Sequence, residues 1–147
     1  MIKKFTDDRG DFILFDSHSC DQVNVVVNPK RYTFRGLHYQ EKPYRQRKTV
    51  KVVQGRVIDF LYDLDNGEVK MIPLDKDSEP LLVEKNYAHG YLTIEPNTIF
   101  TYAVEGEYNP DSEHSIVWKD VKEIFNLITT LVPVFELVIS EKDKNGK

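Results

Sequence analysis

The sequence predicts one all-β domain, a sandwich or a barrel, over residues 1–147. Short runs rich in β-branched and aromatic residues recur along the chain, and turn residues separate them at near-regular intervals. Few stretches have helical periodicity. With 147 residues, of which 40% are hydrophobic, the chain is long enough for one hydrophobic core and too short to argue for two.

Turn signals divide the chain into the expected strands. An acidic turn at residues 7–11 begins the pattern, and Asn28-Pro29 and Lys42-Pro43 interrupt it further along. Gln54-Gly55 and Asp65-Asn66-Gly67 are short enough to predict hairpin connections. The strands expected between the breaks cover residues 12–15, 23–27, 32–40, 49–53, 56–64, 69–74, 81–84, 91–94, 99–104 and 115–118.

Helical periodicity is confined to residues 118–127, where Val121, Ile124 and Phe125 fall on one side. We therefore expect a short helical segment near the C-terminus. Residues 141–147 are polar and predict a tail that frays, in which Asp143 taken alone is an ordinary surface residue.

Charge and cysteine content exclude several classes of protein. A formal net charge of -4 disfavours a nucleic-acid partner, because such proteins usually present a basic face. The basic run at residues 44–51 fits a solvated edge or an anionic-substrate site equally well. Cys20 is the one cysteine, and no apolar run is long enough for a signal peptide or a membrane span. The expectation is a soluble cytoplasmic protein.

The stretch Phe-Arg-Gly-Leu-His-Tyr-Gln at residues 34–40 combines a cation, Arg35, with an imidazole, His38, and Lys48 opens the next apolar run. Histidine titrates near neutral pH and can take a proton from a carbon acid, while an ammonium group stabilises the negative charge that results. Strict alternation would place Arg35 and His38 on opposite faces of a strand. Both reach one cavity only if Gly36 forms a bulge.

An ordered set of motifs makes the chain similar to a known family. The motifs are Asp8-Arg9-Gly10, Arg35-Gly36-Leu37-His38-Tyr39-Gln40, Gln46-Arg47-Lys48-Thr49-Val50, Gly55-Arg56-Val57-Ile58-Asp59, Ala88-His89-Gly90-Tyr91, Tyr102 and Ser140-Glu141-Lys142-Asp143. In this order they resemble the dTDP-4-dehydrorhamnose 3,5-epimerases, which are RmlC-like cupins. The resemblance implies a double-stranded β-helix (jelly-roll) fold, a homodimer, and an isomerase that needs no metal or organic cofactor.

The resemblance also implies roles for single residues. His38 would remove a proton from a carbon next to the C4 ketone of a nucleotide-linked 4-keto-6-deoxy sugar, and Asp143 would orient its ring. Lys48 would stabilise the enolate, and Tyr102 would return a proton from the opposite face. The substrate-binding residues would be Arg9 and Arg35 at the diphosphate, with Asn24, Gln40 and His89 elsewhere in the site.

The segment around Asn24 departs from the family. The family's Gln-x-Asn-x-Ser-x-Ser run becomes Gln-Val-Asn-Val-Val-Val-Asn at residues 22–28, which removes two hydroxyl groups. Leu14 also stands where the family has a glutamate linked to nucleotide binding, and together these departures suggest a divergent branch, with another nucleotide or with inversion at one carbon only.

Two further functions and a set of purely structural roles stay open. A nucleotide-sugar 3,4-ketoisomerase would use a similar enediolate, and a non-catalytic cupin would only bind a sugar. Taken singly, His38 fits a core histidine, Lys48 a solvated edge cation and Tyr102 a wall of the core. A metal-dependent cupin oxygenase is less well supported, because Gln40 stands where its second histidine ligand belongs.

Overall fold

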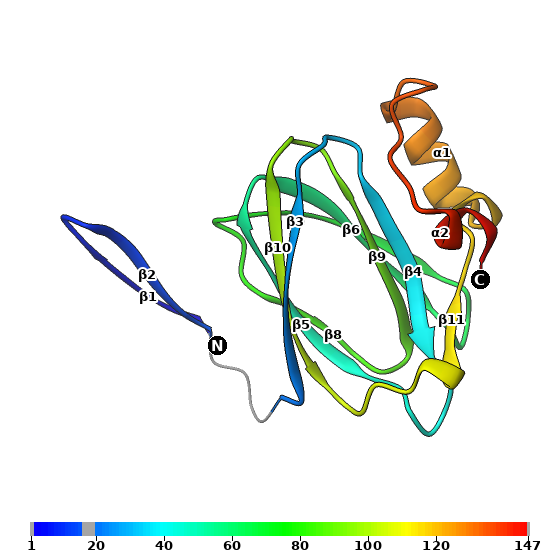
Figure 1. Ribbon diagram of the computed structural model, residues 1–147, viewed down its shortest axis with the longest axis horizontal. Coiled ribbons are helices and arrows are strands. Elements are labelled where there is room, and N and C mark those ends of the chain that lie inside the picture. Colours follow the sequence, from blue (N-terminus) through cyan, green and yellow to red (C-terminus); the bar gives the residue numbers. More distant parts are fainter. Residues whose placement is uncertain (1, 16–19, 147) are drawn as a thin grey trace.

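Two β-sheets face each other in the computed structural model of the chain, which describes residues 2–15 and 20–146 (Figure 1). Within these residues, the strands of one sheet lie in the order β3-β10-β5-β8 and those of the other in the order β11-β4-β9-β6-β7. A separate hairpin, β1–β2, projects away from both sheets. The strands are β1 (Ile2–Asp7), β2 (Gly10–Phe15), β3 (Gln22–Asn28), β4 (Phe34–Gln40), β5 (Arg47–Gln54), β6 (Arg56–Asp63), β7 (Val69–Asp75), β8 (Leu81–Val83), β9 (Tyr87–Thr93), β10 (Thr98–Glu105) and β11 (Glu113–Ser115).

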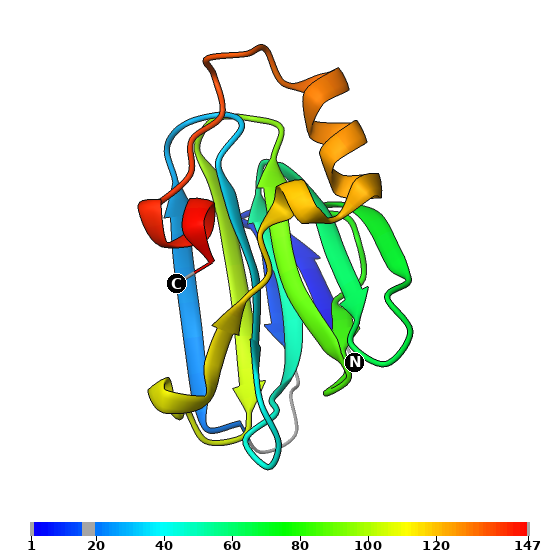
Figure 2. The same cartoon turned by 90° about the vertical axis from the view of Figure 1, so that its right-hand side faces the viewer.

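Alternation along the strands divides the apolar residues between two cores. On β6, Val57 and Leu61 face the interior between the sheets, whereas Phe60 faces the outer side of the five-stranded sheet. The outer core is covered by helix α1 (Lys122–Leu131), which buries Ile124 and Ile128 against it. Figure 2 shows α1 and the short helix α2 (Glu141–Asn145) on this side of the molecule. Because α1 closes the outer face, the interior between the sheets is left for a cavity.

The prediction of an all-β fold is confirmed. One of the two predicted hairpin connections is not. Residues 65–67 join a true hairpin, β6–β7. The prediction of a hairpin at Gln54-Gly55 is wrong, because β5 and β6 belong to different sheets. Gly55 has a φ of +81° and lets the chain pass directly from one sheet to the other.

The C-terminal part differs most from the prediction. The strand expected at 115–118 is shorter and earlier, as β11, and a 3-10 turn (Trp118–Asp120) precedes α1. The prediction of a frayed tail at residues 141–147 is wrong, because α2 forms there. Ser140 is the N-cap of α2, and Asp143 is buried. A 3-10 turn at Pro110–Ser112 precedes β11. None of the helices in the described part of the chain is long and apolar enough to span a bilayer.

Strands β4 and β9 approach each other unusually closely at a pair of glycines. A Cβ atom on Gly36 would lie 2.6 Å from Gly90 Cα, and one on Gly90 would lie 2.6 Å from the Arg35 carbonyl oxygen. The pairing register of β4 with β9 shifts between Arg35 and His38, which is the bulge that the sequence required. Arg35 and His38 therefore both face the interior, while Phe34 and Leu37 join the outer core.

Replacing Gly90 with alanine tests this close approach. The added methyl group would collide with backbone, so we expect the free energy of unfolding to fall by about 1–3 kcal/mol or more. Gly67→Ala is the control: φ there is +78°, but the nearest atom to an added Cβ is 3.5 Å away, so its loss should be only about 1 kcal/mol from backbone strain. Equal losses in urea titrations of the two variants would contradict the steric account.

Candidate active site

A cavity of about 230 Å³ opens between the two sheets. The five-stranded sheet contributes Arg35, His38 and His89, and the four-stranded sheet contributes Lys48 and Tyr102 from the opposite wall. The remaining lining residues are Val26, Gly90, Tyr91, Phe100, Ser140, Lys142 and Asp143. Residues from β3, β4, β5, β9, β10 and the C-terminal turn thus converge on one space, which we call the catalytic cavity.

His38 and Asp143 form a short hydrogen bond across 105 residues of sequence. His38 Nε2 lies 2.6 Å from Asp143 Oδ1, and the two side chains are 30% and 6% exposed. With the carboxylate as acceptor, Nε2 carries the proton and Nδ1 has the free lone pair. This arrangement gives the imidazole one fixed tautomer and a base nitrogen.

The backbone holds the Asp143 carboxylate in place. Gly36 N–H donates a hydrogen bond to Asp143 Oδ2 over 3.1 Å, so the β4 bulge supplies a second hydrogen-bond partner for the same carboxylate. At the other end, Asp143 N–H donates to Ser140 Oγ, which caps α2. The carboxylate is therefore fixed from both the sheet and the C-terminal helix.

Lys48 lies in the cavity wall, half-buried, where its pKa is set by opposing effects. Burial lowers the pKa of Lys48, and the negative charges of Glu113 and Asp59 act against that decrease. Its Nζ lies 5.7 Å from the centre of the Tyr102 ring. A half-buried cation of this kind interacts strongly with any negative charge that develops beside it.

Tyr102 and Arg35 complete the walls. Burial raises the pKa of Tyr102, and the positive charge of Arg35 opposes that rise. Arg35 itself is held by Asn28, whose Oδ1 accepts a 2.9 Å hydrogen bond from Arg35 Nε. Burial raises the pKa of Tyr91 to about 12, so its hydroxyl stays protonated. The ring of Tyr91 stacks on that of Phe100.

His89 bonds a carboxylate that the sequence reasoning left without a role. His89 Nε2 lies 2.7 Å from Asp59 Oδ2, and both side chains are almost fully buried. Burial raises the pKa of Asp59, while His89 and Lys48 counteract part of that rise. A charge inside the apolar run Val57–Leu61 was the signal that could have identified Asp59.

Lys142, which lines the cavity, belongs to a hydrogen-bonded group with Glu113 and Tyr108. Glu113 accepts hydrogen bonds from Lys142 Nζ over 3.3 Å and from the Tyr108 hydroxyl over 3.1 Å. Burial alone would raise the pKa of Glu113, but these two bonds hold it below the ordinary value. Nothing in the sequence links Glu113 with Lys142, because they lie 29 residues apart on different elements.

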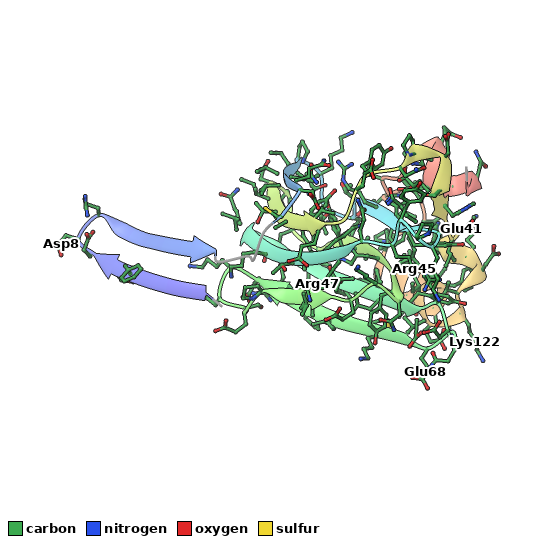
Figure 3. All side chains as sticks on the ribbon, turned by 90° about the horizontal axis from the view of Figure 1, so that it is seen from below. Asp8, Glu41, Arg45, Arg47, Glu68 and Lys122 are labelled. Carbon is green, nitrogen blue, oxygen red and sulfur yellow. The ribbon has the colours of Figure 1, made fainter. Side chains whose placement is uncertain are left out.

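The structure does not bring every predicted residue to the catalytic cavity. Arg9 lies at the turn of the β1–β2 hairpin, pairs with Asp7 at 2.6 Å and is 90% exposed; Figure 3 labels the neighbouring Asp8 at the far tip of the hairpin. Asn24 pairs with Tyr102 in the β3–β10 register and accepts a bond from Gln22, without lining the cavity. The amide of Gln40 bonds the backbone at Tyr44, Glu107 and Asn109.

Metal ligands do not gather in the described part of the chain. No group of three or more histidine, cysteine, aspartate or glutamate residues there could hold a metal ion.

The chain is similar to proteins of one family over nearly its whole length. The family model described as dTDP-4-dehydrorhamnose 3,5-epimerase matches residues 2–147. A Shigella flexneri protein of that name is 30% identical over an alignment 161 positions long, which covers 99% of this chain and 86% of the relative. One from Mycobacterium tuberculosis is 35% identical and covers 77% of this chain, and the chain spans about three-fifths (59%) of that relative's length.

Solved structures agree with these sequence matches. A Bacillus anthracis dTDP-4-dehydrorhamnose 3,5-epimerase, described with TDP and PPi bound, superimposes with a TM-score of 0.81 at 30% identity. The superposition covers 99% of this chain and 90% of that one. It confirms the predicted cupin jelly-roll.

Asp143→Asn should change how folding responds to acid. Burial raises the pKa of Asp143, but its bonds with His38 and Gly36 outweigh this and keep the pKa below the ordinary value. A carboxyl with a depressed folded-state pKa stabilises the fold above its unfolded pKa of about 4, and that contribution is lost as the pH falls through the folded value.

We therefore expect the wild type to exceed Asp143→Asn in unfolding free energy near neutral pH, and the difference to shrink below about pH 4. Urea titrations of both proteins over this pH range measure it. A difference that stays constant with pH would show that the carboxylate charge contributes nothing.

Proposed function

The chain belongs to the dTDP-4-dehydrorhamnose 3,5-epimerase family, and from this membership we propose that it inverts C3, C5 or both in a nucleotide-linked 4-keto-6-deoxy sugar. One observation supports the reaction type above all. His38 and Tyr102 face one cavity from opposite sheets, with Lys48 beside Tyr102. A base on one face of a sugar ring and an acid on the other are what inversion at carbon needs.

The first step is removal of a proton next to the C4 ketone. His38 Nδ1 takes the proton, and the resulting imidazolium is stabilised by Asp143, 2.6 Å from Nε2. The electron pair of the C–H bond moves to the C4 oxygen and forms an enolate. Lys48 stabilises that oxygen, and its own charge is supported by Glu113 and Asp59.

The second step returns a proton from the opposite face. A phenol is protonated at neutral pH, and burial raises the pKa of Tyr102 further, so the hydroxyl has a proton to give. The enolate collapses to the ketone as the Tyr102 proton bonds to carbon, and the centre is inverted. Arg35 then favours the phenolate that remains, since its charge lowers the pKa of Tyr102.

Positive charge at the rim suits the diphosphate of the substrate. Arg35 is fixed by Asn28, and Lys142 lies on the α2 side of the same opening. The Bacillus anthracis relative is described with TDP and PPi bound, which supports a thymidine diphosphate here. With its Nε2 bonded to Asp59, His89 would accept a hydrogen bond from a sugar hydroxyl at Nδ1, and Asn24 and Gln40 would act at the edge of the cavity.

A homodimer would give Arg9 a role in this site. The hairpin places Arg9 away from the cavity of its own chain, and Val23, Val25 and Val27 are 58–65% exposed on the edge strand β3. A second copy packed on these valines would cover an apolar face and could receive the hairpin. Arg9 would then bind the diphosphate in the partner's site.

His38→Ala tests the base. We expect solvent deuterium exchange into a 4-keto sugar nucleotide to fall at least about 100-fold, because no other group takes the substrate proton. His114→Ala is the matched control, since His114 lies on the same sheet with its side chain 43% exposed. Proton NMR measures both, and undiminished exchange in His38→Ala would eliminate His38 as the base.

Tyr102→Phe separates the two steps. It should continue to exchange the substrate proton through His38 while losing inversion by about 100-fold or more, because the acid on the opposite face is missing. Chromatography of the product sugars after reduction measures inversion. If Tyr102→Phe still inverted the centre at the wild-type rate, another group would be the acid.

Mixed dimers test the placement of Arg9. If Arg9 serves the partner's site, a dimer of one Arg9→Ala chain and one His38→Ala chain contains one intact site. Re-equilibrated mixtures of the two inactive variants should then recover about a quarter of wild-type activity, since half of the dimers are mixed. Recovery of none would show that Arg9 acts within its own chain, and an Arg9→Ala variant that is fully active by itself would show that Arg9 has no role in the site.

A further inference from the structure

Two further pockets continue from the catalytic cavity to the surface. The first, which we call the floor pocket, shares His38, Lys48 and His89 with the catalytic cavity. The second, the outer pocket, shares Arg45 and Lys85 with the floor pocket and has a volume of about 510 Å³. Residues of the β4–β5, β6–β7 and β8–β9 connections line the outer pocket, so it lies at one end of the barrel.

The floor pocket is narrow, and polar and apolar surface line it equally. It offers about 10 Å³ to the centre of a water molecule, which is close to the space that one water needs. Gln40 and Gln46 line it, and their amides bond backbone carbonyls of Tyr44, Glu107 and Gly106. These bonds hold the pocket walls in place.

Arg45 provides an unused donor at this point. Its Nε is buried and, among the described residues, has no hydrogen-bond partner. A guanidinium nitrogen can only donate, so the partner must be an acceptor such as a water oxygen. Figure 3, seen from below, labels Arg45 over the body of the barrel. Arg45 thus lies between the outer pocket and the floor pocket.

The proposed reaction creates a need for such a route. Each inversion leaves His38 protonated and Tyr102 deprotonated, so His38 must lose a proton to water before it can act again. A ligand whose diphosphate lies against Arg35 and Lys142 fills the opening of the catalytic cavity. If two carbons are inverted without release, that proton must leave by another path.

We propose that Arg45 anchors an ordered water in the floor pocket, and that this water carries protons between His38 and bulk solvent while a ligand fills the catalytic cavity. The imidazolium N–H bond breaks, the proton bonds to the water oxygen, and the hydronium passes it to solvent through the outer pocket. Arg45 is a positioning residue in this step. The kinetic part of the proposal rests on the proposed function, whereas the water site does not.

The first experiment is a high-resolution crystal structure of the protein with dTDP bound, for the wild type and for Arg45→Leu. We expect a water within hydrogen-bond distance of Arg45 Nε in the wild type. It should be missing in Arg45→Leu, because the donor that anchors it is removed. A dry floor pocket in the wild type overturns the proposal even if the enzyme is active. If the wild type exchanges no substrate proton, the proposed function fails, and this structure still decides the water site.

The second experiment uses substrate deuterated at C3 and C5 in ordinary water. In Arg45→Leu we expect kcat to fall about tenfold with KM unchanged, and recovered substrate to keep its deuterium, because the deuteron returns from His38 to carbon. Arg47→Leu is the control, since Arg47 pairs with Glu105 and does not line the floor pocket. Equal loss of deuterium per turnover in Arg45→Leu and the wild type would overturn the proposal, because a structural defect slows exchange and turnover together.

Discussion

The close approach of β4 and β9 at Gly36 and Gly90 is the constraint on which the rest of the site depends. Neither position has room for a side chain, and the bulge beside them changes the alternation of β4. As a result Arg35 and His38 share one face, and the Gly36 N–H is turned to the Asp143 carboxylate. The bulge therefore places Arg35 and His38 in one cavity and docks the C-terminal helix whose Asp143 bonds His38.

Burial and charge have opposing effects on the pKa values of Lys48 and Tyr102. Burial lowers the pKa of Lys48, and the negative charges of Glu113 and Asp59 oppose that decrease and favour the ammonium form. Burial raises the pKa of Tyr102, which keeps a proton on the phenol, while Arg35 favours its release. These opposing effects come from different strands and from the C-terminal segment, so the cavity has its chemistry only in the folded chain.

Local pattern was enough to predict most of the sheet, because alternation and turn residues act over a few positions. The bulge at Gly36 followed from requiring Arg35 and His38 in one cavity, and the structure confirms it. Sheet membership did not follow: Gln54-Gly55 has the length of a hairpin turn, but Gly55 leads the chain into the other sheet. The tail was misjudged because Asp143 is buried only by contacts with residues over 100 positions away. The bond between Glu113 and Lys142 joins elements 29 residues apart and has no local sequence signal, and the roles assigned to the site residues stay predictions.

The most direct measurement is proton NMR of the wild-type protein in deuterium oxide with dTDP-4-keto-6-deoxyglucose and, in parallel, GDP-linked 4-keto-6-deoxymannose. An epimerase whose base and acid face each other across the ring should place solvent deuterium at C3, C5 or both, with inversion of each labelled centre and with the ketone still at C4. A carbonyl that moves from C4 to C3 would identify a ketoisomerase instead. Folded protein that introduces no deuterium into either sugar would contradict the catalytic account and leave a cupin that only binds its ligand.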